Sequence, residues 1–213
     1  MDNDAAHPIT LTFADNAAWR GAITAVKAGS VTFNEGTDHT IADGAITFHA
    51  GKLAAGEQVI TVTASGYNDT EVRQFVYAIP PTLTADTTDN DVDHPITLTF
   101  TDDAAWRGAI TAVKAGSVTF NEGTDYTIAG GAITFLAGKL AAGEPVITVT
   151  ASGYNETEIR QFVYAIPPAL TADAMDNNVG HPITLTFEDN ADWRDAITAI
   201  MVGATALIEG SDY

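Results

Sequence analysis

The residues best suited to chemistry in this sequence are six aspartates that lie close together near position 90. They are Asp86, Asp89, Asp91, Asp93, Asp102 and Asp103. Calcium prefers roughly six to eight oxygen ligands, so carboxylates at this spacing, beside a proline-containing joint, predict a Ca²⁺ site. The alternative is a solvated acidic loop that favours solubility. No complete EF-hand loop is present, so the sequence establishes no cofactor with certainty, and calcium is the candidate at these aspartates.

Histidine is the second type of candidate ligand. The histidines that recur along the chain are His7, His94 and His181. Each precedes a proline where a strand is predicted to begin, and a single imidazole makes a poor metal site. We therefore predict that each ring bonds a nearby backbone or acidic group. His39 and His49 are replaced by Tyr126 and Leu136 at the positions 87 residues later, which indicates no shared role.

Tyrosine and tryptophan recur in the same way. The residues are Tyr67, Tyr77, Tyr154, Tyr164, Trp19, Trp106 and Trp193. A tyrosine phenolate can ligate haem iron, which is one interpretation of the tyrosines. The stronger interpretation is structural, because a Gly-Tyr pair is typical of a tight turn whose ring packs on a sheet. The tryptophans are predicted to lie in the core beside a short helix.

No arrangement of residues typical of an enzyme stands out. The chain contains no Cys, which excludes thiolate nucleophiles, disulfides, iron–sulfur clusters and the usual structural zinc sites. The sequence shows no recognisable nucleophile with its base, no pair of carboxylates in a pocket and no phosphate-binding glycine loop. We predict that the protein is not an enzyme.

The sequence is a tandem array, and this organisation positions every residue named above. The heptapeptide HPITLTF begins at His7, His94 and His181, each 87 residues after the last. Residues 1–79 and 88–166 differ at 11 of 79 positions. We predict a first module at 1–79 without its N-terminal strand, a complete central module at 80–166, and the first half of a third module at 167–213. We expect the chain to be part of a longer array.

Within the central module the patterns predict about seven short strands. Ile96, Leu98 and Phe100 alternate with threonines, as in a strand with one buried face. Asp102 or Asp103 is expected to cap a short helix around Trp106. Two predicted hairpins follow at 113–120 and 126–135, and two further strands at 145–150 and 158–165. The segment 138–143 is ambiguous. We predict an all-β fold of tandem Ig-like β-sandwich modules, each with a short helical segment around its Trp.

Composition narrows the class of partner. There are 28 acidic residues against 9 Lys and Arg, giving a formal charge of −19 and a pI near 4.2. Nucleic-acid phosphates and anionic membrane surfaces would repel such a chain, so we predict no nucleic-acid partner. No apolar run approaches the roughly 20 residues of a membrane-spanning helix, so we predict no membrane insertion. The composition is compatible with an extracellular or cell-surface location, with any signal or anchor outside this fragment.

The repeats also resemble a known family. In the third copy the matching residues run from Phe187 to Ile197, followed by Leu207 and Gly-Ser-Asp-Tyr at 210–213. In the central copy they run from Gly143 to Tyr154, with Gln161 downstream. This pattern is similar to the haemoglobin-interacting-domain family, formerly a domain of unknown function. The family is named for modules of a bacterial surface receptor that captures haemoglobin, and similar modules occur in large secreted and cell-wall-associated proteins.

Three functions follow from these observations. We favour a non-catalytic extracellular repeat module that acts as a spacer or adhesive array of a bacterial surface or secreted protein. The resemblance implies a second function, in which an exposed face captures haemoglobin or another host protein. The incomplete modules suggest a third function, self-assembly through open strand edges.

Overall fold

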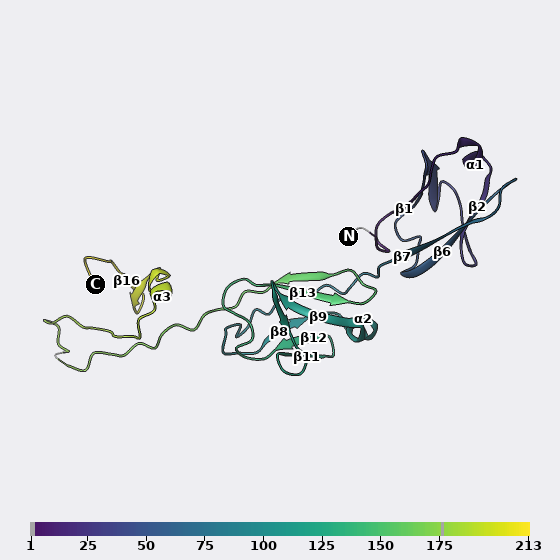
Figure 1. The fold of residues 1–213 in the computed structure, drawn as a ribbon. Coiled ribbons are helices and arrows are strands. Elements are labelled where there is room, and N and C mark those ends of the chain that lie inside the picture. Colours follow the sequence, from purple (N-terminus) through teal and green to yellow (C-terminus); the bar gives the residue numbers. More distant parts are fainter. Residues whose placement is uncertain (1–2, 176) are drawn as a thin grey trace. The chain divides into compact units, whose positions relative to one another are not determined.

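The computed structural model describes residues 3–175 and 177–213 of the chain. Contacts between Cα atoms divide the chain into two compact units, residues 1–164 and residues 165–213. The first unit contains two β-rich modules with the same order of elements, and the described residues of the second form one short helix and one hairpin (Figure 1). The predicted all-β architecture with short helices is therefore confirmed.

Among its described residues, the first module contains seven strands and one helix. They are β1 (Ile9–Thr12), α1 (Ala17–Gly21), β2 (Ile23–Ala28), β3 (Val31–Phe33), β4 (His39–Ala42), β5 (Ala45–Phe48), β6 (Gly56–Ala64) and β7 (Thr70–Val76). One sheet has the strand order β1-β5-β4 and the other β3-β2-β6-β7, with antiparallel pairing throughout. Strands that are far apart in sequence therefore share a sheet.

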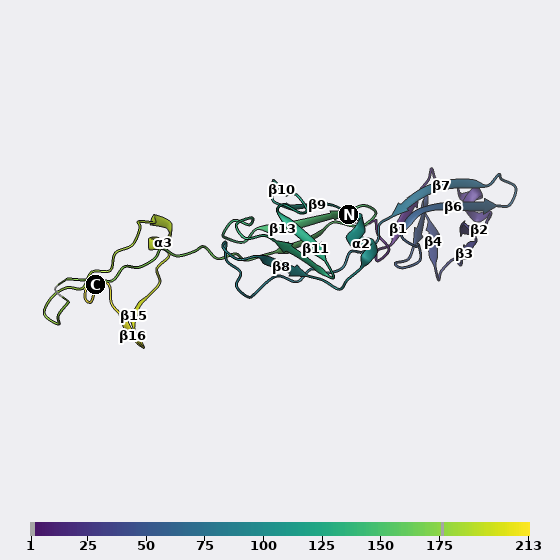
Figure 2. The ribbon, with the colours of Figure 1, turned by 90° about the horizontal axis from the view of Figure 1, so that it is seen from below.

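The central module repeats this arrangement. Its elements are β8 (Ile96–Thr99), α2 (Ala104–Ala109), β9 (Ile110–Ala115), β10 (Val118–Phe120), β11 (Tyr126–Ala129), β12 (Ala132–Phe135), β13 (Val146–Ala151) and β14 (Thr157–Arg160). The sheets have the orders β11-β12-β8 and β10-β9-β13-β14, and α2 lies at one end of the module (Figure 2). These seven strands match the predicted number.

Two local features of the central module differ from the sequence prediction. The last strand is shorter than the predicted 158–165, because regular pairing ends at Arg160. Beyond it, the N–H of Gln161 donates to the carbonyl of Pro145, and Val163 pairs with Gly143. The ambiguous segment 138–143 forms turns, with Leu140 buried in the core.

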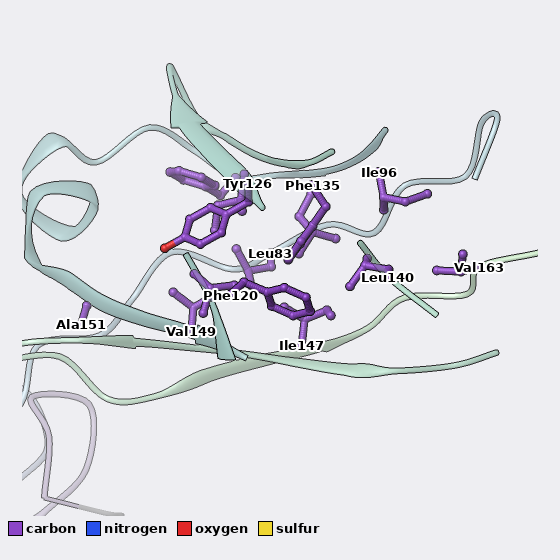
Figure 3. Packing of buried hydrophobic residues seen from close by; sticks show 14 of the residues in the cluster. Leu83, Ile96, Phe120, Tyr126, Phe135, Leu140, Ile147, Val149, Ala151 and Val163 are labelled. Atoms are coloured by element: carbon purple, nitrogen blue, oxygen red, sulfur yellow. The ribbon is translucent and has the colours of Figure 1, made fainter. Parts of the chain in front are cut away.

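Alternating side chains from both sheets form the core of the central module. Ile96 and Leu98 of β8, Ile133 of β12 and Ile147 of β13 are buried almost completely. They pack with the aromatic rings of the same cluster (Figure 3). Burying such side chains stabilises a fold by about 1.5–3 kcal/mol each, so this two-sided core holds the sandwich together.

The second unit builds no comparable core. Its elements are α3 (Ala191–Asp195), β15 (Ile200–Val202) and β16 (Thr205–Leu207), and β15 pairs with β16. Among the described residues from 165 onward, none falls in the buried class. Among the described residues of this unit, one short helix and a single hairpin provide no second layer for their apolar side chains to pack against.

His39 makes the stability of the first module sensitive to pH. The ring is buried beside Phe48, with 5.8 Å between ring centroids, and its Nδ1 has no hydrogen-bond partner among the described residues. Burial lowers the pKa of His39 below the ordinary 6.5, although the nearby Glu35 and Asp38 carboxylates act in the opposite direction.

We expect the first module to lose stability as the pH falls through about 6.5, because the unfolded chain then takes up a proton that the buried ring resists. The variant His39→Tyr, which copies Tyr126 of the central module, should remove this part of the pH dependence. Thermal unfolding of both proteins between pH 5 and pH 8 is the measurement. A midpoint that changes equally in the two proteins would contradict this role of His39.

Candidate functional site

The predicted acidic cluster divides into separate structural roles. Asp86 accepts the backbone N–H of Thr88 at 3.1 Å with one carboxylate oxygen, and that of Thr97 at 2.8 Å with the other. Asp91 accepts the N–H of Asp93 at 2.9 Å. These bonds fix the loop that leads into β8.

The two later aspartates serve the helix. Asp103 is the N-cap of α2, and its Oδ1 accepts the N–H groups of Ala105 and Trp106 at 2.9 and 3.0 Å. Asp102 forms an ion pair with Arg107 at 3.2 Å. The sequence did not distinguish Asp102 from Asp103 as the N-cap of this helix, and the structure shows that the N-cap is Asp103.

Calcium binding by this cluster stays a prediction. Asp89 adopts a left-handed turn conformation with φ of 50°, and Asp93 is exposed. Within the part of the chain that the structure describes, no three acidic, His or Cys side chains are grouped as metal ligands. Calorimetric titration with Ca²⁺ tests the prediction directly.

Two of the recurring histidines, His7 and His94, bond an acidic side chain as predicted, whereas His181 does not. His94 lies 2.8 Å from Oδ1 of Asp91, and His7 lies 2.9 Å from Asp4. The hydrogen bond from His94 is the main cause that lowers the pKa of Asp91, and the same bond raises the pKa of His94. In the third copy the partner is an amide, and His181 lies 2.7 Å from Asn178.

Asp4 lies where the first module meets the central module. Its carboxylate is 1% exposed, and it accepts hydrogen bonds from His7, from the N–H of Ala6 at 2.8 Å and from Nδ2 of Asn155 at 2.6 Å. Burial raises the pKa of Asp4, but these hydrogen bonds together outweigh it and hold the pKa below 3.8. The carboxylate therefore stabilises the junction at neutral pH and loses this effect as the pH falls through its lowered pKa.

Backbone pairing strengthens the same junction. The N–H of Ala78 donates to the carbonyl of Gly153 at 2.9 Å, and the N–H of Asn155 donates to the carbonyl of Ala78 at 3.0 Å. A loop of the central module thus holds the end of the first module by its backbone and by one side chain. The sequence predicted this loop only as a turn. Asn155 and Asp4 are 151 positions apart, and nothing in the sequence indicates that they bond each other.

The tyrosines lie near the module ends. Tyr154 belongs to the junction loop and is half-buried, whereas Tyr67, its counterpart in the first module, is 46% exposed. Tyr77 and Tyr164 each pack edge-on against a phenylalanine two residues earlier. Haem ligation by these tyrosines stays an untested interpretation. Trp106 is fully buried, which confirms its predicted place in the core.

Comparison with known proteins supplies the family. The family model described as "Heme-binding protein Shr-like, Hb-interacting domain" matches residues 1–77, 83–164 and 170–213. No curated protein matches the chain significantly.

The solved structures that this chain resembles are distant in sequence. Murine CEACAM1b has 16% identity and a TM-score of 0.37, with 76% of this chain and 94% of that chain covered. The N-terminal eight Ig domains of Down Syndrome Cell Adhesion Molecule give 11% identity and a TM-score of 0.38, covering 78% of this chain and 23% of that one. The I9–I11 tandem of titin gives 8% identity and a TM-score of 0.32, covering 78% of this chain and 64% of that one.

The family match covers nearly the whole chain in three tandem segments, and each segment contains one copy of the HPITLTF repeat. The resemblance predicted from the sequence is therefore confirmed. This chain belongs to the haemoglobin-interacting-domain family of Shr-like haem-binding proteins.

Proposed function

We propose that the chain is a non-catalytic array of surface modules whose junctions fix the spacing of successive binding faces. The observation that carries this proposal is the junction in which the loop 152–155 bonds both Asp4 and Ala78. A pair of modules held by several hydrogen bonds presents its repeated faces at a constant separation, which favours multivalent contact. Each module then contributes a fixed length to the array.

The central module carries the same acceptor for a following module. Asp91 is the counterpart of Asp4 and also bonds its histidine, but its side chain is 23% exposed whereas that of Asp4 is 2% exposed. This difference in exposure agrees with the hydrogen bonds. Asp4 accepts a bond from Asn155, whereas Asp91 accepts no equivalent bond among the described residues. The junction is therefore built from groups that recur with the 87-residue period.

Loss of the Asn155 side chain should loosen the junction. The chain has no native Cys, so spin labels can be attached to cysteines placed at the exposed Ser30 and Ser117. We expect Asn155→Ala to broaden the distance distribution between the labels, because Asp4 loses one of its donors. Asn68→Ala is the matched control, since Asn68 is the exposed counterpart in the first module. Equal distributions in wild type and Asn155→Ala would refute the proposal.

Haemoglobin capture is the second candidate function, and the family match favours it. We propose an extracellular or cell-surface location for either function. No helix among the described residues is both long enough and apolar enough to cross a membrane.

Biolayer interferometry of the full chain against immobilised haemoglobin tests capture. Saturable binding at physiological salt is the expected result if an exposed face captures haemoglobin, and tandem modules should slow dissociation through avidity. Running the titration with and without Ca²⁺ also tests the calcium prediction. If no binding is seen either with or without Ca²⁺, haemoglobin capture is contradicted and only the spacing function remains.

A further inference from the structure

Most basic side chains of this acidic chain already have a partner. Six of the nine Lys and Arg side chains form an ion pair with a carboxylate of the same repeat. Among the described residues, the three that form none are Lys27, Lys114 and Arg160. All three lie on strands of a four-stranded sheet, Lys27 in the first module and the other two in the central module. The unpaired positive charges of the chain therefore share one kind of surface.

This surface is the outer face of the four-stranded sheet, which is the side that points away from the core. Ile147 of β13 points into the core (Figure 3), so Val146 and Thr148 on either side of it stand on the outer face. Residues directly opposite each other on paired strands point to the same side of a sheet. Thr148 is opposite Lys114 of β9 and Glu158 of β14, and both charged side chains are exposed. One row across the outer face therefore consists of Lys, Thr and Glu.

Neither charge of this row is neutralised within the part of the chain that the structure describes. Lys114 and Glu158 stand two strands apart, which is roughly 9–10 Å, and neither forms an ion pair. The hydroxyl of the threonine between them donates to Glu158 at 3.2 Å. The first module has the same row, in which Lys27 and Glu71 flank Thr61 and also lack an ion pair. Both modules thus expose one free positive and one free negative charge in the same order.

An exposed aromatic side chain adds apolar area to the same face. Phe75 is opposite Glu57 on the outer side of the sheet, and its side chain is 41% exposed. Its counterpart in the central module, Phe162, is 43% exposed. Arg73 and Arg160 lie two positions before these rings, on the same side of the strand. Aromatic and Arg side chains are enriched in protein–protein interfaces, which favours a protein as the partner of this face.

We propose that the outer face of the four-stranded sheet pairs with the same face of a second copy of this chain, around a two-fold axis along the middle of the sheet. In the central module the axis follows β13, so β9 of one copy lies over β14 of the other. Lys114 of each copy then meets Glu158 of the other copy. Val146 and Thr148 lie on the axis and pack against their own counterparts. Aligned packing of two sheets in this way is common in β proteins.

The order of charges favours a second copy over a partner of one charge sign. The row sums to zero, whereas the whole chain carries −19. A strongly basic partner would be drawn to the acidic remainder of the surface, and an acidic partner would be repelled by the chain as a whole. The rotated face itself presents the complementary order of charges. At about 0.15 M salt the repulsion between distant acidic residues is screened, whereas charges in direct contact still attract each other.

Sedimentation velocity of the full chain over about 10 µM to 1 mM tests the proposal, because a small face with two ion pairs gives weak affinity. The measurement is made at about 0.15 M salt. The expected result is an average mass that starts at 22.3 kDa and approaches or exceeds twice that value as the concentration rises.

Charge reversal in both modules tests the two-fold pairing itself. A chain with Lys27→Glu and Lys114→Glu should stay monomeric, and so should a chain with Glu71→Lys and Glu158→Lys, because like charges then face each other. An equimolar mixture of the two chains should associate, since every positive charge then meets a negative one and the total charge equals that of two wild-type chains.

The matched control reverses two exposed glutamates outside this face. A chain with Glu35→Lys and Glu122→Lys has the same net charge as the second variant and should still associate. Circular dichroism checks that each variant is folded.

Three results would overturn the proposal. The first is a wild-type mass that stays at one chain over the whole range, which would leave a different protein as the partner of the face. The second is association that survives in either charge-reversed chain, because the contact then lies elsewhere. The third is a mixture that stays monomeric although the wild type associates. None of these measurements depends on the junction between the modules, so they are independent of the spacing function.

Discussion

Replacing Trp106 by alanine is expected to destabilise the central module by about 3–5 kcal/mol, the usual cost of removing a buried tryptophan. Trp106 is 0% exposed and packs edge-on against Phe100, with 4.9 Å between ring centroids. It belongs to the single cluster that joins both sheets and the segment at Leu83. Urea unfolding of the full chain by circular dichroism measures the loss, and hydrogen exchange assigns it to residues 80–166.

Two variants separate packing from polar effects. Trp106→Phe should reduce the free energy of unfolding much less than Trp106→Ala. The buried Nε1 of Trp106 has no hydrogen-bond partner among the described residues, and phenylalanine removes this unsatisfied donor. Trp19→Ala, at the matched position in the first module, should also cost less, because Trp19 is partly exposed. Equal losses for Trp19→Ala and Trp106→Ala would show that covering by residues 83–86 adds nothing to the core.

Replacing Gly131 by alanine should also be strongly destabilising. Gly131 has φ of +83°, a conformation that costs an L-residue about 1–2 kcal/mol. A Cβ at this position would lie 2.7 Å from the carbonyl oxygen of Phe100, which is backbone and cannot rotate away. The hydrogen bond from the N–H of Phe100 to the carbonyl of Gly131, 2.8 Å long, would then be strained, at a further cost of about 1 kcal/mol.

The neighbouring glycine provides the control for this prediction. Gly130 also has positive φ, at +46°, but a Cβ there would meet no atom within 4 Å. The first module places Asp43 at the equivalent position with φ of +46°, so Gly130→Asp should be tolerated. Chemical denaturation of the two variants should separate them clearly. A loss for Gly130→Asp as large as that for Gly131→Ala would contradict the role assigned to the close backbone contact.

Local patterns in the sequence predicted most of the fold. The alternation at Ile96 and Leu98 predicted β8, the glycine-containing turns predicted both hairpins, and an aspartate before Trp106 predicted the helix cap. Each of these elements depends on residues within a few positions of one another, so residue propensity and the hydrophobic period are enough to predict it. The end of β14 was predicted less well, because the backbone partners of Gln161 and Val163 are Pro145 and Gly143, which lie well outside the local pattern.

The sequence by itself determined that this protein is an acidic, Cys-free array of 87-residue β-modules, and it predicted the acidic partners of His7 and His94 but not the amide partner of His181. Only the tertiary structure decided that Asp4 is buried against Asn155 and that Leu83 is buried in the core of the central module. The physical reason is separation along the chain. A bond between residues 151 positions apart depends on packing that no local pattern encodes, and so does the cluster in which Leu83 meets side chains of both sheets of its module.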